Sequence, residues 1–328
     1  PAKYNFLKTT NLYDKDEWLM ANAYGDVTKN DYGTEVNGGN WGIINMNGDT
    51  ILPFKFKEID FVNDSIANLL DYDGKAYLMN INSMTTLTNP EANYISQINY
   101  DWQNPTYLIG KDVVRGEYGD ATGGTYGLID GTGKELIPFS YSEIKQEGDF
   151  YIANSIDFNG FDLLSESGKV IVNRAKSIQP LNDSLFLILN ENKGYIYNAN
   201  QKVKHSSDEF SDFATPEYFS TYGNIFIGAQ VGSNLWGIIN RQGEMIIKPQ
   251  FCDVKASDEA YIIVAKCGTP GEAYKYGVID LMNNILIPFE YEAIEAGYGG
   301  KYTCTKDKTE YTISLANEIL DKKPASEE

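Results

Sequence analysis

One short pattern recurs along the chain and restricts its fold more than any other feature. An aromatic residue is followed by glycine, two aliphatic residues and Asn or Asp, in four copies that begin at Trp41, Tyr126, Trp236 and Tyr276. After each copy the chain turns, as at Asn47-Gly48, and a second apolar run then reaches a proline. An aromatic residue follows within three positions, and an aliphatic residue lies three positions beyond it, as at Phe56 and Ile59. Such shared offsets indicate one duplicated structural unit.

Weaker copies of the same strand begin at Tyr77, Phe161, Tyr195 and Tyr311. Every copy is preceded by a further short run of β-branched and aromatic residues, such as Tyr261-Ile262-Ile263-Val264, bounded by Gly, Asn or Asp. This composition is typical of β-strands. No window of helical length shows an amphipathic period of 3.6 residues free of turn residues. The sequence therefore predicts an all-β chain without a long helix.

The repeat predicts a single β domain over residues 1–328, with about eight units of three to four strands. A unit comprises a strand, a hairpin loop, the W-G strand, a glycine turn, a proline-ended strand and the aromatic-x-x-aliphatic segment. The predicted units span residues 16–59, 65–98, 105–144, 149–178, 184–219, 224–254, 260–294 and 301–320 plus 1–7.

The two ends of the chain look complementary. The last copy stops after Glu318-Ile319-Leu320, whereas Pro1, Tyr4 and Leu7 have the spacing of the proline, aromatic and aliphatic positions found elsewhere. A last unit completed by the first residues would close the units into a ring and remove free sheet edges. The spacing therefore favours a closed, β-propeller-like ring over an open β-solenoid, which would need polar caps instead.

The series W-G-I-I-N, N-G, I-L-P and F-K-E-I between Trp41 and Ile59 resembles the WG repeat, also called the KWG repeat, of bacterial proteins. The resemblance covers most of the chain and is weak in the copies that lack the W-G dipeptide. It implies ligand or protein binding and carries no catalytic motif. Proteins with this repeat occur inside and outside the cytoplasm, so the compartment stays open between cytoplasmic and extracytoplasmic.

Net charge restricts the partners. The formal charge is −19, from 46 acidic and 27 basic residues, and such a surface repels nucleic acids. The same field attracts a basic partner, although it could equally serve only solubility. The sequence has no run of 18 apolar residues, so no membrane span is expected. The three cysteines, Cys252, Cys267 and Cys304, imply no disulfide framework.

No residue pattern supports catalysis or a cofactor. His205 has no His or Cys nearby with which to form a zinc or nucleophile site. Asp130 and Asp280 occupy the place of Asn45 and Asn240 in the sister copies, which indicates turn residues before the paired carboxylates of a glycoside hydrolase. We therefore expect no enzyme, no cofactor and no metal site.

Departures from the repeat indicate where binding occurs. The loop after the first strand of a unit is long at Tyr24–Asn40, Val114–Thr125 and Gly268–Lys275, and a ring would present these loops on one face. A fourth insertion, His205–Tyr222, is rich in aromatic and acidic residues, and either forms a contact surface or folds back over a core edge. The candidate binding residues are Tyr32, Tyr118, Phe210, Phe213, Tyr218 and Phe219.

These features predict a non-catalytic binding scaffold for protein–protein interaction. An adaptor, or an inhibitor of the immunity type that holds a basic toxin, would fit the acidic aromatic loops. The alternative is recognition of a glycan or cell-surface polymer through exposed Tyr and Trp side chains, and a glycoside hydrolase is a third, weaker interpretation.

Overall fold

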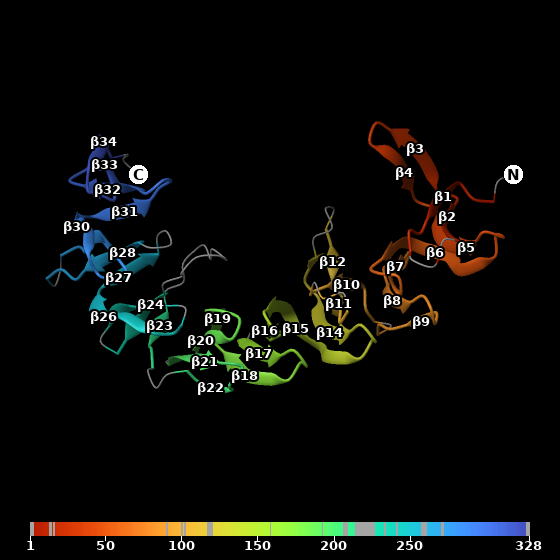
Figure 1. Cartoon of the computed structure of the whole chain (residues 1–328), viewed down its shortest axis with the longest axis horizontal. Helices are drawn as coiled ribbons and strands as arrows, with labels where there is room; N and C mark the ends of the chain where they lie inside the picture. Colours follow the sequence, from red (N-terminus) through yellow and green to blue (C-terminus); the bar gives the residue numbers. More distant parts are fainter. Residues whose placement is uncertain are drawn as a thin grey trace. The chain divides into compact units, whose positions relative to one another are not determined.

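The chain is built from antiparallel β-sheets (Figure 1). The computed structural model describes residues 3–325 except 13–14, 16, 90, 100, 102, 117–120, 158, 192, 206–208, 214–226, 233, 241, 257–260 and 270–271. Every regular element in the described part of the chain is a strand. The prediction of an all-β repeat fold is confirmed.

The chain divides into two compact units, and each is described by itself. Unit 1 comprises residues 1–146, 150–159 and 164–170, and unit 2 comprises residues 147–149, 160–163 and 171–328.

The strands follow one scheme, here called a module: four consecutive antiparallel strands, with short hairpins inserted in two loops. The first seven-stranded sheet has the order β1 (Phe6–Thr9), β2 (Trp18–Ala23), β5 (Asn40–Asn45), β6 (Thr50–Phe61), β7 (Ile66–Asp71), β8 (Ala76–Asn80) and β9 (Thr85–Thr86). The second has the order β10 (Tyr94–Gln97), β11 (Thr106–Lys111), β14 (Thr125–Asp130), β15 (Glu135–Glu147), β16 (Phe150–Ser155), β17 (Phe161–Ser165) and β18 (Val170–Ala175).

Each seven-stranded sheet contains two modules that share one long strand. The first half of β6 pairs with β5, and its second half pairs with β7. The inserted hairpins are β3 (Asp26–Asn30) with β4 (Gly33–Asn37), and β12 (Val114–Arg115) with β13 (Ala121–Thr122).

Four further modules are separate four-stranded sheets. They contain β19 (Ser177–Pro180), β20 (Leu185–Leu189), β21 (Gly194–Asn198) and β22 (Val203–Lys204); β23 (Asp212–Phe213), β24 (Ile227–Val231), β25 (Leu235–Ile239) and β26 (Met245–Phe251); β27 (Asp253–Ala256), β28 (Tyr261–Lys266), β29 (Lys275–Asp280) and β30 (Ile285–Tyr291); and β31 (Ala293–Ala296), β32 (Lys301–Lys306), β33 (Thr309–Ser314) and β34 (Ile319–Pro324).

The hydrophobic core lies between consecutive modules. In unit 1, Met20 and Ile43 of the first module pack in one cluster with Ala67 and Leu69 of the second. In unit 2, clusters of the same kind join β25 to β28 and β29 to β32. A sheet buried on both faces cannot be stable without its neighbours, which is the physical reason why the module is repeated.

The W-G dipeptide creates the same irregular pairing in all four strong copies. Its aromatic residue faces the aromatic residue that follows the proline of the next strand, in the pairs Trp41–Phe56, Tyr126–Tyr141, Trp236–Phe251 and Tyr276–Tyr291. The expectation that this strand ends at its proline is wrong, because β6, β15, β26 and β30 all continue through it to the aromatic residue. The next paired residues show a register shift, so the proline-containing strand bulges over the glycine. All four aromatic residues pack in or against inter-module cores, as predicted.

Glycine is required at the bulge because the partner backbone lies against it. A Cβ on Gly277 would lie 2.7 Å from the carbonyl oxygen of Ile287, and a Cβ on each of the other three glycines would lie 2.5 to 2.8 Å from the equivalent carbonyl oxygen.

The aromatic residue of the fourth strong copy also makes a polar contact. The hydroxyl of Tyr276 donates to Asp253 Oδ2 at 2.7 Å, and burial together with this bond raises the pKa of Tyr276 to about 12.

The hydrogen-bonded module is shifted by one strand relative to the predicted unit. The aromatic-x-x-aliphatic segment that ends a predicted unit leads into the first strand of the next module: Ile59 pairs with Leu69, and Val254 pairs with Val264. Consequently β1 pairs with β2 and completes the first module, and β34 completes the last. A last copy completed by residues 1–7, and with it the closure of the modules into a ring, stays a prediction.

The close contact at the bulge predicts that replacing Gly277 destabilises the fold. We expect Gly277→Ala to lower the free energy of unfolding by about 1–3 kcal/mol, because overpacking against the β30 backbone forces a shift. Gly268→Ala is the matched control, since its nearest neighbour is the Glu272 side chain at 3.1 Å, and it should cost less than about 0.5 kcal/mol. Equal denaturation midpoints for both variants would contradict the role assigned to the bulge.

Candidate functional site

The hairpin β3–β4 projects from the first module between β2 and β5 (Figure 1). Nine of its ten strand residues are exposed, with Val36 half-buried, and Tyr32 at its turn is 99% exposed. Its base is fixed by Asn22, a fully buried amide that donates to the Gly38 carbonyl and accepts from the Gly25 N–H. The hairpin is thus an exposed arm on a rigid base.

One repeat position fixes the loop bases in three modules. This position, here called the lock position, directly precedes the first strand of a module. Asn5 bonds the carbonyl of Gly25 and the N–H of Tyr24, and Asn93 bonds both the carbonyl and the N–H of Val113. These two Asn residues anchor the starts of the first two long loops predicted from the sequence.

In the third long-loop module the lock position holds a cysteine. Cys252 forms a disulfide with Cys267, at the start of the loop Gly268–Lys275. Its backbone N–H donates to Ala265, just as Asn93 donates to Gly110. The sequence analysis did not predict this disulfide. The position of Cys252 in the repeat could have indicated it, because Cys252 follows the aromatic Phe251 as Asn5 follows Tyr4.

The third cysteine is free. Cys304 is buried, and burial raises the pKa of its thiol to about 12, which makes the thiol unreactive.

The strand-end carboxylates form turns. Asp280 accepts the N–H groups of Met282 and Asn284, and Asn45 accepts those of Asn47 and Asp49 in the same way. The hydrogen bond from the Asn284 side chain, together with the backbone bonds, lowers the pKa of Asp280. At Asp130, partial burial alone would raise the pKa of the carboxyl. Hydrogen bonds from Thr132 and Lys134 outweigh burial, so the pKa of Asp130 is also lowered.

The predicted binding residues fall into three groups. Tyr32 is exposed at the tip of the hairpin. Tyr118, Tyr218 and Phe219 lie outside the described residues. The structure places Phe210 and Phe213 in the core instead of on a contact surface.

The burial of these two rings has a repeat-based cause. Phe210 is 3% exposed, and Phe213 packs against the same cluster and pairs with Ala229 as Val254 pairs with Val264. Phe210 and Phe213 therefore occupy the aromatic and aliphatic positions of the repeat, which the sequence analysis missed because no proline precedes them. The described residues 209–213 of the insertion His205–Tyr222 therefore agree with the second alternative, in which the insertion folds back over a core edge.

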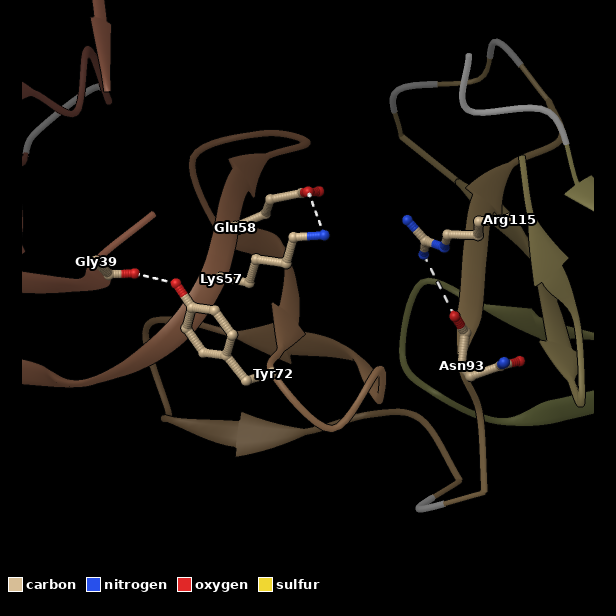
Figure 2. A network of polar contacts seen from close by, with 6 residues as sticks. All are labelled: Gly39, Lys57, Glu58, Tyr72, Asn93 and Arg115. Carbon is tan, nitrogen blue, oxygen red and sulfur yellow. Dashed lines mark hydrogen bonds and ion pairs between the residues drawn. The ribbon is translucent and has the colours of Figure 1, made fainter. Parts of the chain in front are cut away.

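Loops of consecutive modules meet on one side of unit 1. The hydroxyl of Tyr72, in the turn between β7 and β8, donates to the carbonyl of Gly39 at the base of the hairpin (Figure 2). Tyr24 and Tyr72 are 85% and 54% exposed. We call the segments Tyr24–Asn40 and Asp71–Lys75 the loop surface.

A cleft of about 250 Å³ borders the loop surface. Its lining includes Leu70, Asp71 and Tyr72 from the second module, and Asn93 and Val113 from the third. Two cationic side chains, Lys57 and Arg115, lie on opposite sides of it and point toward one another (Figure 2). Arg115 donates to the Asn93 carbonyl at 3.3 Å and lies over the ring of Tyr94 at 5.6 Å. This feature combines a cavity with converging charge.

The described part of the chain gives no sign of a membrane helix or a metal centre. It contains no helix long and apolar enough to cross a membrane. Within the same described residues, no three or more His, Cys, Asp or Glu side chains form a group that could hold a metal ion.

The fold defines a β-repeat protein made of four-stranded modules. The repeat itself is the WG containing repeat, whose family model matches residues 41–68, 126–151, 236–266 and 276–302. The chain therefore carries WG containing repeats, and each matched stretch runs from a W-G strand into the second strand of the next module.

No curated protein matches the chain. Among solved structures, a eukaryotic initiation factor aligns over 98% of this chain and 80% of its own, with 11% identity and a TM-score of 0.38. The C-terminal WD40 domain of Sif2 aligns over 80% and 82%, with 14% identity and a TM-score of 0.30. BamB from Moraxella catarrhalis aligns over 98% and 87%, with 9% identity and a TM-score of 0.30. Scores this low define no shared arrangement of modules.

The disulfide can be tested by reduction. Its cysteines are separated by 15 residues, and a closed loop of that size corresponds to about 3 kcal/mol of stabilisation. We expect dithiothreitol to lower the urea midpoint of the native chain and to leave the double variant Cys252→Ser, Cys267→Ser unaffected. If reduction shifted both proteins equally, the stabilisation would not come from this bond.

The hydrogen bonds of Asp280 predict how two substitutions of this residue change the stability of the chain. Asp280→Asn should fold like the native chain at neutral pH, because Asn240 makes the same turn. Asp280→Ala should lose about 1 kcal/mol, since two N–H groups lose their acceptor. Because the pKa of Asp280 is lowered on folding, its contribution is present above the unfolded pKa and lost as the pH falls through the folded pKa.

Urea titrations at neutral pH and near pH 3 measure this contribution. The native chain should lose stability relative to Asp280→Asn only in acid. A stability difference between these two proteins that does not change with pH would contradict the assignment.

Proposed function

We propose that the chain is a non-catalytic scaffold that binds another polypeptide through the loop surface. The hairpin β3–β4 supports this most directly. None of its ten strand residues is buried, yet Asn5, Asn22 and Tyr72 all bond its base. A two-stranded hairpin is marginally stable alone, so a fixed base and an exposed arm favour a role in contact with a partner.

The exposed side chains suit a polypeptide partner. Tyr24, Tyr32 and Tyr72 supply large apolar rings with a polar end, and such rings give contact area at low cost in conformational entropy. Their spacing over a hairpin and a turn supports contact with an extended surface more than with a single small molecule.

The charge favours a basic partner. The chain carries a formal charge of −19, and the hairpin itself holds Asp26, Asp31 and Glu35 against Lys29. Such a field raises the rate of encounter with a positively charged protein and weakens as salt screens it. An adaptor, or an inhibitor of the immunity type, would work in this way.

A capture experiment tests this proposal. Cross-linking with mass spectrometry identifies the polypeptide held by the native chain, and surface plasmon resonance then measures its affinity. Tyr32→Ala should weaken binding by about tenfold or more, as loss of an interfacial tyrosine does. Tyr298→Ala is the matched control, because Tyr298 is 100% exposed and lies in unit 2.

We expect the affinity for that partner to fall as the salt concentration rises. Unchanged affinity in Tyr32→Ala and in a variant with residues 26–37 replaced by two glycines would overturn the proposal. Binding to glycans that survives high salt would point to the carbohydrate alternative.

A further inference from the structure

The cleft beside the loop surface departs from the repeat at the lock position. In the first and third modules this position holds Asn5 and Asn93, whose amides are used by the backbone of their own loops. The second module begins within the shared strand β6, whose regular pairing with β7 starts at Glu58, so Lys57 holds the lock position there, next to Phe56. Its loop is the short turn Asp71–Lys75, which is closed by Asp71 itself through bonds from Gly74 and Lys75. Lys57 therefore has no loop to fix, and its side chain lines the cleft.

Lys57 faces a second cation across the cleft. Arg115 comes from β12 in the third module, and the two side chains point toward one another (Figure 2). Two like charges that face a shared cavity repel, and an anion between them removes that repulsion. In a chain with a formal charge of −19, this pairing of cations runs against the overall composition.

The acidic groups that the structure describes beside the cleft make bonds of their own or pair only weakly with the two cations. Asp71 accepts the hydroxyl of Tyr77 at 2.7 Å and the N–H of Lys75 at 2.9 Å. Glu58 lies 3.9 Å from Lys57, but both side chains are more than half exposed, and such a pair contributes little. Among the residues that the structure describes, no carboxylate forms an ion pair with Arg115, and its guanidinium donates to the Asn93 carbonyl.

We propose that this cleft binds a single carboxylate group, held between Lys57 and Arg115. The guanidinium of Arg115 offers parallel N–H groups that match the two oxygens of a carboxylate, and Lys57 adds a second charge. Leu70 and Val113, which are 7% and 5% exposed, form an apolar lining for the carbon atoms next to it. The cleft of about 250 Å³ is smaller than pockets for drug-sized ligands and suits a group the size of one side chain.

A carboxylate fits better than a multiply charged anion. The acidic chain repels an approaching phosphate dianion more strongly than a monoanion. Because the cleft adjoins a surface of hairpins and turns, we assign the carboxylate to an acidic side chain of a polypeptide. This inference does not rest on the hairpin β3–β4, so it can stand or fall apart from the proposed function.

The test uses small probes on the full chain. N-acetylglutamate N-methylamide carries one side-chain carboxylate and is titrated while the backbone amide signals are followed by NMR. We expect saturable shifts around Asn93 and Val113, with millimolar affinity that falls about tenfold in Lys57→Gln and is lost in the double variant Lys57→Gln, Arg115→Gln. Lys29→Gln is the matched control, since it removes one exposed charge from the hairpin and should change the affinity by less than twofold.

The outcomes separate the possible ligands. Absence of saturable shifts in the native chain, or shifts that persist in the double variant, would overturn the proposal. Binding of glucuronate without binding of the glutamate probe would overturn the assignment to a polypeptide. Tighter binding of inorganic phosphate than of the glutamate probe would show a general anion site and contradict selection of a carboxylate. Circular dichroism checks that the variants are folded.

Discussion

The structure depends on one close backbone contact, which only glycine permits. At each strong copy of the repeat the proline-containing strand bulges, and one of its carbonyl oxygens lies too close to the glycine to leave room for a Cβ. The bulge sets the aromatic residue of one strand opposite the aromatic residue of the next, as at Trp41 and Phe56. This contact fixes the register of the module, and the faces of the sheet can then pack against the neighbouring modules.

The glycine and the paired aromatic residues are needed for the core of every strong copy, so the copies can differ in sequence only at other positions of the module. The lock position shows this most clearly. Asparagine at this position fixes a loop by hydrogen bonds, and cysteine fixes one by a disulfide. Lys57 fixes no loop, and its side chain lines a cleft instead. A repeat protein can in this way obtain distinct sites from one scaffold without a change in the core.

The sequence predicted the strands well because their signals are local. Alternation of apolar residues, the W-G dipeptide and the glycine turns located even the weak copies at Tyr77 and Tyr311, which lie in β8 and β33. Long-range features were harder. The disulfide joins residues that only pairing of β27 with β28 brings together, and the assignment of Phe210 and Phe213 failed because the aromatic spacing lacked its proline. The cleft needs two modules and has no signal within either.

Amide hydrogen exchange tests the central claim most directly. If one glycine-dependent bulge organises every strong copy, the N–H groups of Ile43, Leu128, Ile238 and Val278, all fully buried at the same module position, should belong to the slowest-exchanging class. Fast exchange at any one of these positions, with slow exchange at the others, would contradict a common constraint.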